Sequence, residues 1–182
     1  MFRASAFDWK SKPGKLYRLM FRTLIIITFL SQFLTQPALA QDEVEDILRC
    51  KILDADKYLS VQLEGQNLIY RFSRSDELEL ELNAAAIDAY TPWPGVGRNY
   101  YEAVTFENSG YVYEVYYTVD RLDLEKPAEA GVIVSKGDEV LARLICDQNS
   151  LLIQQLTELS GMLADRGLCW SYESHEWQGC EG

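Results

Sequence analysis

Residues 99–120 constrain the fold most, because their side chains alternate in character along two arms. Both arms are rich in tyrosine, valine and threonine, the aromatic and β-branched types that strands favour. Between them, Asn108, Ser109 and Gly110 tolerate the positive φ angles of a short hairpin loop. The pattern predicts a long β-hairpin. On its first arm, one face holds Tyr100, Glu102, Val104 and Phe106.

Six further segments show strand patterns, which gives about eight antiparallel strands in a mainly β fold. We expect the additional strands at 47–53, 57–64, 68–72, 77–82, 130–135 and 139–146. Short antiparallel strands joined mostly by hairpins suit a small barrel or a β-sandwich. The sequence leaves both architectures open.

The hydrophobic period changes after the last predicted strand. Ser150 can cap a helix that ends at Gly167, and we expect this C-terminal helix to pack on the β domain. Its apolar stripe consists of Leu152, Ile153, Leu156, Leu159, Met162 and Leu163.

The four cysteines predict two disulfides, for which three pairings are possible. We expect Cys50 to pair with Cys146, which would tie the first strand to the last. Cys169 would then pair with Cys180 and close a tail loop. The spacing is not that of a zinc-thiolate site.

Residues 1–40 have the features of a cleaved signal peptide. Basic residues precede an apolar run at 24–34, and Ala38-Leu39-Ala40 offers small residues to a signal peptidase before Gln41. The run is shorter than the roughly 20 residues of a membrane-spanning helix. An uncleaved membrane anchor is the alternative.

Cleavage would leave a single periplasmic or secreted domain, 41–182, with no stable membrane anchor. Its β core would cover 45–146, and its helix and tail loop would cover 147–182. Without the six basic residues and one acidic residue of 1–40, the chain has 11 basic and 27 acidic residues, a net charge of −16. Such a charge argues against nucleic-acid binding and favours a cationic protein partner. Acidity that only keeps the protein soluble is the alternative.

The connection 83–98 is a candidate binding loop. Prolines and glycines prevent a regular element in its second half, and long loops on a rigid sheet often carry binding residues. Tyr90, Trp93 and Arg98 are of the types that anchor interfaces. Alternatively, Trp93 folds back and closes one end of a barrel.

The tail is a second candidate, because a disulfide-closed loop loses little entropy on binding. It contains Trp170, Tyr172, His175 and Trp177, which we expect to form a rigid aromatic contact surface. Two alternatives are a metal site at His175 with its neighbouring glutamates and a purely structural cover over the helix junction.

The chain has no catalytic signature. It lacks a phosphate-binding glycine loop, a dinucleotide fingerprint and a Gly-x-Ser-x-Gly stretch, so we expect no catalytic residue, no metal and no cofactor. Glu79 and Glu81 have the separation of glycosidase carboxylates, but any i, i+2 pair on a strand has it too. A carboxylate-dependent hydrolase is the enzymatic alternative.

The outline of an exported acidic β domain loosely resembles the periplasmic and membrane-bound inhibitors of c-type lysozymes. Those inhibitors present a Ser-Gly-x-Arg-Tyr-like loop to the enzyme cleft. The nearest stretch here is Val96-Gly97-Arg98-Asn99-Tyr100, which has the glycine and the arginine, lacks the serine and has an extra residue before the tyrosine. The strands also resemble those of uncharacterised exported bacterial β-proteins.

The resemblance implies a non-enzymatic inhibitor or immunity factor that binds a cationic enzyme such as a lysozyme. The alternative is a barrel that binds a small ligand or a glycan in a cavity lined by Tyr111, Tyr113 and Tyr117.

Overall fold

The computed structural model describes residues 44–123, 125–150 and 153–180. The predicted signal peptide, 1–40, and Leu152 of the predicted apolar stripe lie outside these residues. Among the helices that are described, none is long and apolar enough to cross a bilayer.

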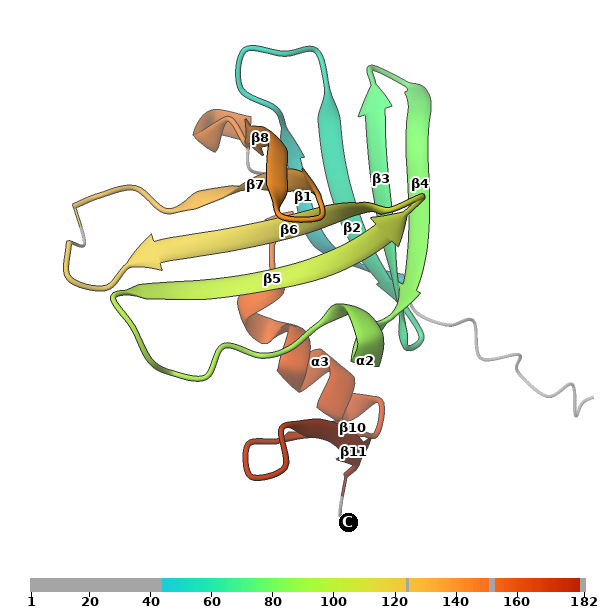
Figure 1. The fold of residues 1–182 in the computed structure, drawn as a ribbon, viewed down its shortest axis with the longest axis vertical. Helices are drawn as coiled ribbons and strands as arrows, with labels where there is room; N and C mark the ends of the chain where they lie inside the picture. Colours follow the sequence, from blue (N-terminus) through green and yellow to red (C-terminus); the bar gives the residue numbers. More distant parts are fainter. Residues whose placement is uncertain (1–43, 124, 151–152, 181–182) are drawn as a thin grey trace, which may run out of the picture. The chain divides into compact units, whose positions relative to one another are not determined.

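Strands account for most of the described chain and form three antiparallel sheets (Figure 1). The first sheet has the order β4-β3-β2-β1-β9, the second has the order β5-β6-β7-β8, and β10 and β11 form the third. The first sheet comprises β1 (Val44–Lys51), β2 (Tyr58–Glu64), β3 (Asn67–Arg74), β4 (Glu77–Ala85) and β9 (Ile153–Gln154). The second comprises β5 (Asn99–Asn108), β6 (Tyr111–Asp120), β7 (Glu129–Lys136) and β8 (Glu139–Ile145). All eight predicted strands are therefore confirmed, with differences of a few residues at their ends.

The predicted central hairpin is β5 and β6. The two strands pair without interruption from Asn99 opposite Asp120 to Asn108 opposite Tyr111. Ser109 and Gly110 form the turn with φ angles of 53° and 80°, in the left-handed region that the short loop requires.

The two large sheets pack face to face as a sandwich and do not close into a barrel. Their strands cross at a steep angle in Figure 1. Between them, the ring of Tyr70 on β3 lies 5.5 Å from that of Phe106 on β5 and 5.7 Å from that of Tyr113 on β6. Of the two predicted architectures, the sandwich is the one observed.

One corner of the sandwich is tied covalently. Cys50 and Cys146 form the predicted disulfide, with their Cα atoms 5.6 Å apart. Beside it, the Leu53 amide donates to the Ile145 carbonyl at 2.8 Å, and the Asp147 amide donates to the Lys51 carbonyl at 2.8 Å. These hydrogen bonds join the chain at the end of β1 to the chain at the end of β8 through an isolated bridge, without making a continuous sheet.

The predicted start of the C-terminal helix is wrong. Ser150 ends a 3-10 turn, Gln148–Ser150, and its Oγ accepts a hydrogen bond from the Lys51 amide at 3.0 Å. Ile153 lies in β9 and pairs with Arg49 of β1. The free edge of β1 offers backbone hydrogen bonds there, which outweigh the local helical period.

The helix itself is shorter than expected but has the predicted buried stripe. A 3-10 turn, Leu156–Glu158, leads into α3, Leu159–Asp165. Leu156, Leu159 and Leu163 are fully buried, and Gly167 ends the segment with a φ of 82°.

The tail is a hairpin and not only a loop. Strands β10 (Leu168–Ser171) and β11 (Glu176–Gly179) pair with each other, and the predicted disulfide joins Cys169 to Cys180. Two disulfides indicate an oxidising, non-cytoplasmic environment.

Candidate functional site

A trough beside β5 is the candidate site, and the segment that leads from β4 into β5 shapes it. This segment begins with a short helix, α2 (Ala86–Ala89), which sequence analysis did not predict. The Ala86 amide donates to the Gln66 carbonyl at 2.9 Å, and Tyr90 then forms an isolated antiparallel bridge with Val104. The segment therefore runs along the otherwise free edge of β5.

Tyr90 is a core residue, although we expected it to contact a partner. Its side chain is only 2% exposed, and its ring packs 5.9 Å from that of Trp177. Its carbonyl oxygen accepts a hydrogen bond of 2.8 Å from the Trp177 indole. The side chain is buried because α2 and the C-terminal hairpin close over it, so no partner can reach it in this conformation.

Trp93 packs back against its own loop and also lines the trough. Its ring lies edge-on to Tyr100 at 4.9 Å, and the Arg121 guanidinium lies 5.0 Å from the ring centre. The indole nitrogen donates to the Val96 carbonyl at 3.1 Å. These contacts hold the loop in one conformation.

Glu102 anchors this loop from the inner face of β5. The carboxylate is 5% exposed, and its Oε1 accepts hydrogen bonds from the Tyr100 hydroxyl at 2.9 Å and the Trp93 amide at 3.3 Å. Within the described residues, Oε2 makes no hydrogen bond of normal geometry and no cation pairs with the group. Burial raises the pKa of Glu102. The Tyr90 hydroxyl interacts with the carboxylate and, with Tyr100 and the Trp93 amide, opposes the effect of burial on its pKa.

Sequence analysis did not single out Glu102 as a site residue. The signal was present, because Glu102 occupies a position between Tyr100 and Val104 on the face whose other members pack inward. A carboxylate on the inward-facing side of a strand is buried when the strand packs, so it needs hydrogen-bond donors from the surrounding fold.

Arg98 closes the base of the same loop. Its Nε lies 3.0 and 2.9 Å from the two carboxylate oxygens of Asp120, which is 8% exposed, and its carbonyl accepts from the Arg121 amide at 3.0 Å. The hydrogen bond from Arg98 lowers the pKa of Asp120. The predicted contact residue therefore has a structural role in the loop, while its side chain remains accessible.

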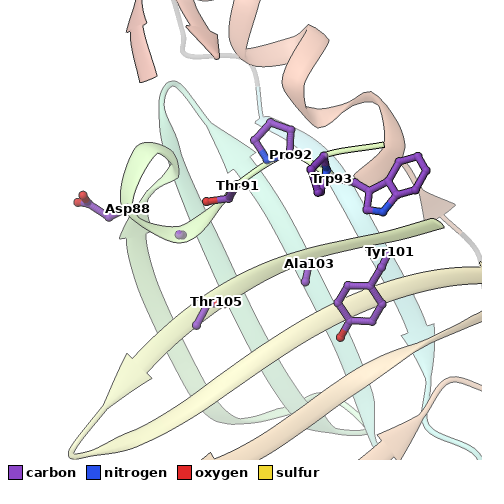
Figure 2. A pocket seen from close by; sticks show the side chains of 9 residues that line it. Asp88, Thr91, Pro92, Trp93, Tyr101, Ala103 and Thr105 are labelled. Carbon is purple, nitrogen blue, oxygen red and sulfur yellow. The ribbon is translucent and has the colours of Figure 1, made fainter. Parts of the chain in front are cut away.

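The trough itself lies on the face of β5 that points away from the core. One section has a volume of about 360 Å³, and Figure 2 shows Trp93 and Tyr101 at one end and Asp88 at the other. The adjoining section, also about 360 Å³, shares Asp88 and Thr105 and adds Asn83 and Glu107. The trough is thus aromatic at one end and acidic at the other.

The acidic end has no internal counter-charge. Asp88 and Glu107 are exposed, and neither takes part in an ion pair within the described part of the chain. Unpaired carboxylates beside aromatic rings attract a cationic group by charge and by the ring faces together. The arrangement therefore suits a positively charged ligand.

The tail brings three of its four predicted residues together. Trp170 lies edge-on to Trp177 at 5.4 Å, and both line a pocket with His175. His175 occupies the β10–β11 turn with a φ of 57°. Tyr172 lies apart from this pocket and is 61% exposed. No group of three or more potential metal-ligating side chains occurs in the described residues.

The carboxylates considered for hydrolysis have a structural environment. Glu79 pairs with Lys57 and Arg74, and Glu81 pairs with Arg71. The hydrogen bond from Lys57 lowers the pKa of Glu79, whereas a general acid needs a raised one.

The tyrosines considered for a barrel cavity do not line the trough. Tyr113 and Tyr117 pack against the core of the sandwich, and Tyr111 lies beneath the ammonium group of Lys136 at 4.7 Å. None of the three lines the trough, the hairpin pocket or the pocket beside Asp120. The trough at the edge of β5 is therefore a better candidate for a small-ligand site than the three tyrosines.

The trough and the hairpin pocket supply the relevant chemistry, which is aromatic and acidic. No protein-family model matches the chain, and neither a curated protein nor a solved structure shows significant similarity to it.

Proposed function

We propose that this chain is a periplasmic or secreted binding protein, of inhibitor or immunity type, which holds a cationic protein such as a lysozyme in the trough beside β5. The observation that carries the proposal is the pairing of aromatic rings, Trp93 and Tyr101, with the free carboxylates of Asp88 and Glu107 in one trough.

The distribution of charge supports a cationic partner. Most basic side chains of the described chain are already engaged, because they form ion pairs with carboxylates of the same chain. These paired residues are Arg49, Lys57, Arg71, Arg74, Arg98, Arg143 and Arg166. The excess of acidic residues is therefore left facing solvent, where it speeds encounter with a basic protein.

The construction of the loop supports tight binding once contact is made. Trp93 is held by Tyr100 and Arg121, and Arg98 is held by Asp120. A loop that is already ordered loses less conformational entropy when a partner binds. Affinity would then come from the aromatic end of the trough and association rate from its acidic end.

The test is a binding titration of the exported chain with a c-type lysozyme, at low and high salt, together with an assay of lysozyme activity. We expect binding that weakens with salt and inhibition at excess chain. The double variant Asp88→Asn, Glu107→Gln should bind more weakly and show less salt dependence.

The matched control is Asp138→Asn, Glu139→Gln, which removes the same charge from two exposed positions, one in the β7–β8 turn and one at the start of β8. It should bind like the wild type. Full lysozyme activity and no heat of binding at low salt would reject a lysozyme partner. Equal weakening by the two double variants would reject the trough as the site.

A glycan is the second candidate ligand, because Thr91 and Thr105 add hydroxyl groups to the trough that Trp93 and Tyr101 also line. Saccharide sites combine a stacking ring with a few polar groups. Binding of a neutral oligosaccharide would change tryptophan fluorescence at any salt concentration and would persist in Asp88→Asn, Glu107→Gln. Salt-independent binding of this kind would favour the glycan over the basic protein.

A further inference from the structure

A second pocket lies on the other side of α2, between this helix and the C-terminal hairpin. It has a volume of about 350 Å³. Ile87 and Thr91 form one wall, and the hairpin supplies Trp170, His175, Glu176 and Trp177. Segments far apart in the chain therefore build it together.

The aromatic walls of this pocket are held in place before any ligand arrives. The Trp177 indole donates to the Tyr90 carbonyl at 2.8 Å, and Trp170 lies edge-on to Trp177 with ring centres 5.4 Å apart. The disulfide between Cys169 and Cys180 closes the hairpin around both rings. Little conformational freedom remains to be lost on binding.

The chemistry of the pocket suits an organic cation. The faces of tryptophan rings are the strongest aromatic acceptors for a cationic group. Glu176 adds an exposed carboxylate, which takes part in no ion pair among the described residues. A planar guanidinium can lie against a ring and donate two hydrogen bonds to one carboxylate, which an ammonium group cannot do.

We propose that this pocket binds the guanidinium group of an arginine side chain on the cationic protein partner. The inference rests on the proposed function, because the partner supplies the arginine. Thr91 lines both this pocket and the trough, so a partner seated in the trough reaches the pocket across α2. The hairpin is then the element that selects a partner with arginine at this position.

The probe is N-acetyl-arginine amide, with N-acetyl-citrulline amide as a neutral near-isostere. Titration of the exported chain is followed through the indole NH resonances of Trp170 and Trp177. We expect a saturable shift with the arginine probe and none with the citrulline probe. Glu176→Gln should weaken binding of the arginine probe several-fold, because it removes the paired charge.

Trp170→Ala should remove the response at the Trp177 resonance. The matched control is Tyr172→Ala, on the same hairpin but outside the pocket, which should leave probe binding unchanged. Glu176 is exposed and makes no internal ion pair, so Glu176→Gln tests the pocket even where Trp170→Ala disturbs the hairpin.

Equal shifts with the two probes, or unchanged binding in Glu176→Gln, would overturn the pocket assignment. The proposed function has a separate outcome. A basic protein that binds the wild type and Glu176→Gln equally, but binds Asp88→Asn, Glu107→Gln weakly, would leave the trough as the site and remove the pocket. Arginine-probe binding without any basic-protein binding would keep the guanidinium pocket and reject the proposed function.

Discussion

Two glutamates in the second sheet, Glu102 on β5 and Glu129 on β7, lie in opposite electrostatic environments. On β5, Glu102 accepts a hydrogen bond from the Tyr100 hydroxyl at 2.9 Å but has no cation beside it. On β7, Glu129 accepts from the Tyr116 hydroxyl at 2.7 Å and also from Arg143 at 2.7 Å. Both glutamates accept a hydrogen bond from a tyrosine hydroxyl, but Glu102 is buried without a cation, whereas Glu129 is partly exposed and paired with Arg143.

The difference appears in the pKa values of the two groups. Burial raises the pKa of Glu102, whereas the hydrogen bond from Tyr116, assisted by Arg143, lowers the pKa of Glu129. The Glu129 carboxylate is therefore balanced by its neighbours and serves the fold. The β5 end leaves acidic groups unbalanced, and this is the end where the trough lies.

The largest effect is expected from Gly131→Ala at the β7–β8 end. A Cβ at this position would lie 2.2 Å from the Leu144 carbonyl oxygen, a backbone atom that cannot move alone. We expect a loss of about 3 kcal/mol in unfolding free energy, measured by denaturant titration. Gly161→Ala, where a Cβ meets nothing within 4 Å inside α3, should raise stability instead. A tolerated Gly131→Ala would show that the β7–β8 pairing can move to make room for a Cβ at this position.

Glu129→Ala should lower the free energy of unfolding by about 2 kcal/mol at neutral pH. The buried Tyr116 hydroxyl would lose its acceptor, and Arg143 would lose its ion-pair partner. The folded-state pKa of Glu129 is lowered, so its contribution is present above the unfolded pKa of about 4.3 and is lost as pH falls further. Unfolding curves over a range of acidic pH values measure this. A variant with the same acid sensitivity as the wild type would contradict the assignment.

Glu102→Gln should raise the free energy of unfolding by about 1 kcal/mol in mild base, whereas Glu129→Ala lowers it. The folded-state pKa of Glu102 is raised, so its contribution is complete below the unfolded pKa and is lost as pH rises through the folded pKa. Glutamine keeps an oxygen for Tyr100 and Trp93 and carries no charge. The variant should therefore match the wild type in acid and exceed its stability in mild base. Destabilisation at high pH would show that the charged form is the one the fold requires.

Asp88→Asn should change stability by less than about 0.5 kcal/mol, because the side chain is exposed and unpaired within the described residues. Its effect should appear in the association rate with a basic protein, and more strongly at low salt. Stopped-flow fluorescence would measure it. A stability loss as large as that of Glu129→Ala would remove the contrast between the two ends.

Strands were predictable because each one shows its pattern locally. The alternation along β5 and β6, with Ser109 and Gly110 between them, needs no other part of the chain to be recognised. The helix start was not predictable, since Ile153 joins β1, which lies far away in sequence. The burial of Tyr90 was missed for a similar reason, because its cover comes from Trp177.

The candidate site likewise combines residues that the sequence singles out with residues that only tertiary contacts bring together. Trp93, Trp170, His175 and Trp177 were recognised by residue type, but the trough they border or adjoin also needs Asp88, Glu107 and Tyr101. Those residues have no unusual local pattern. Their meeting depends on how α2 lies along β5, which is a contact between segments.

The sequence by itself determined the mainly β fold, the two disulfides and the excess of acidic residues, because period, cysteine number and charge are properties of the chain. The tertiary structure alone decided between sandwich and barrel, buried Tyr90 and Glu102, and placed carboxylates beside aromatic rings along β5. The physical reason is that burial and charge pairing depend on neighbours distant in sequence, which only the packed sheets bring together.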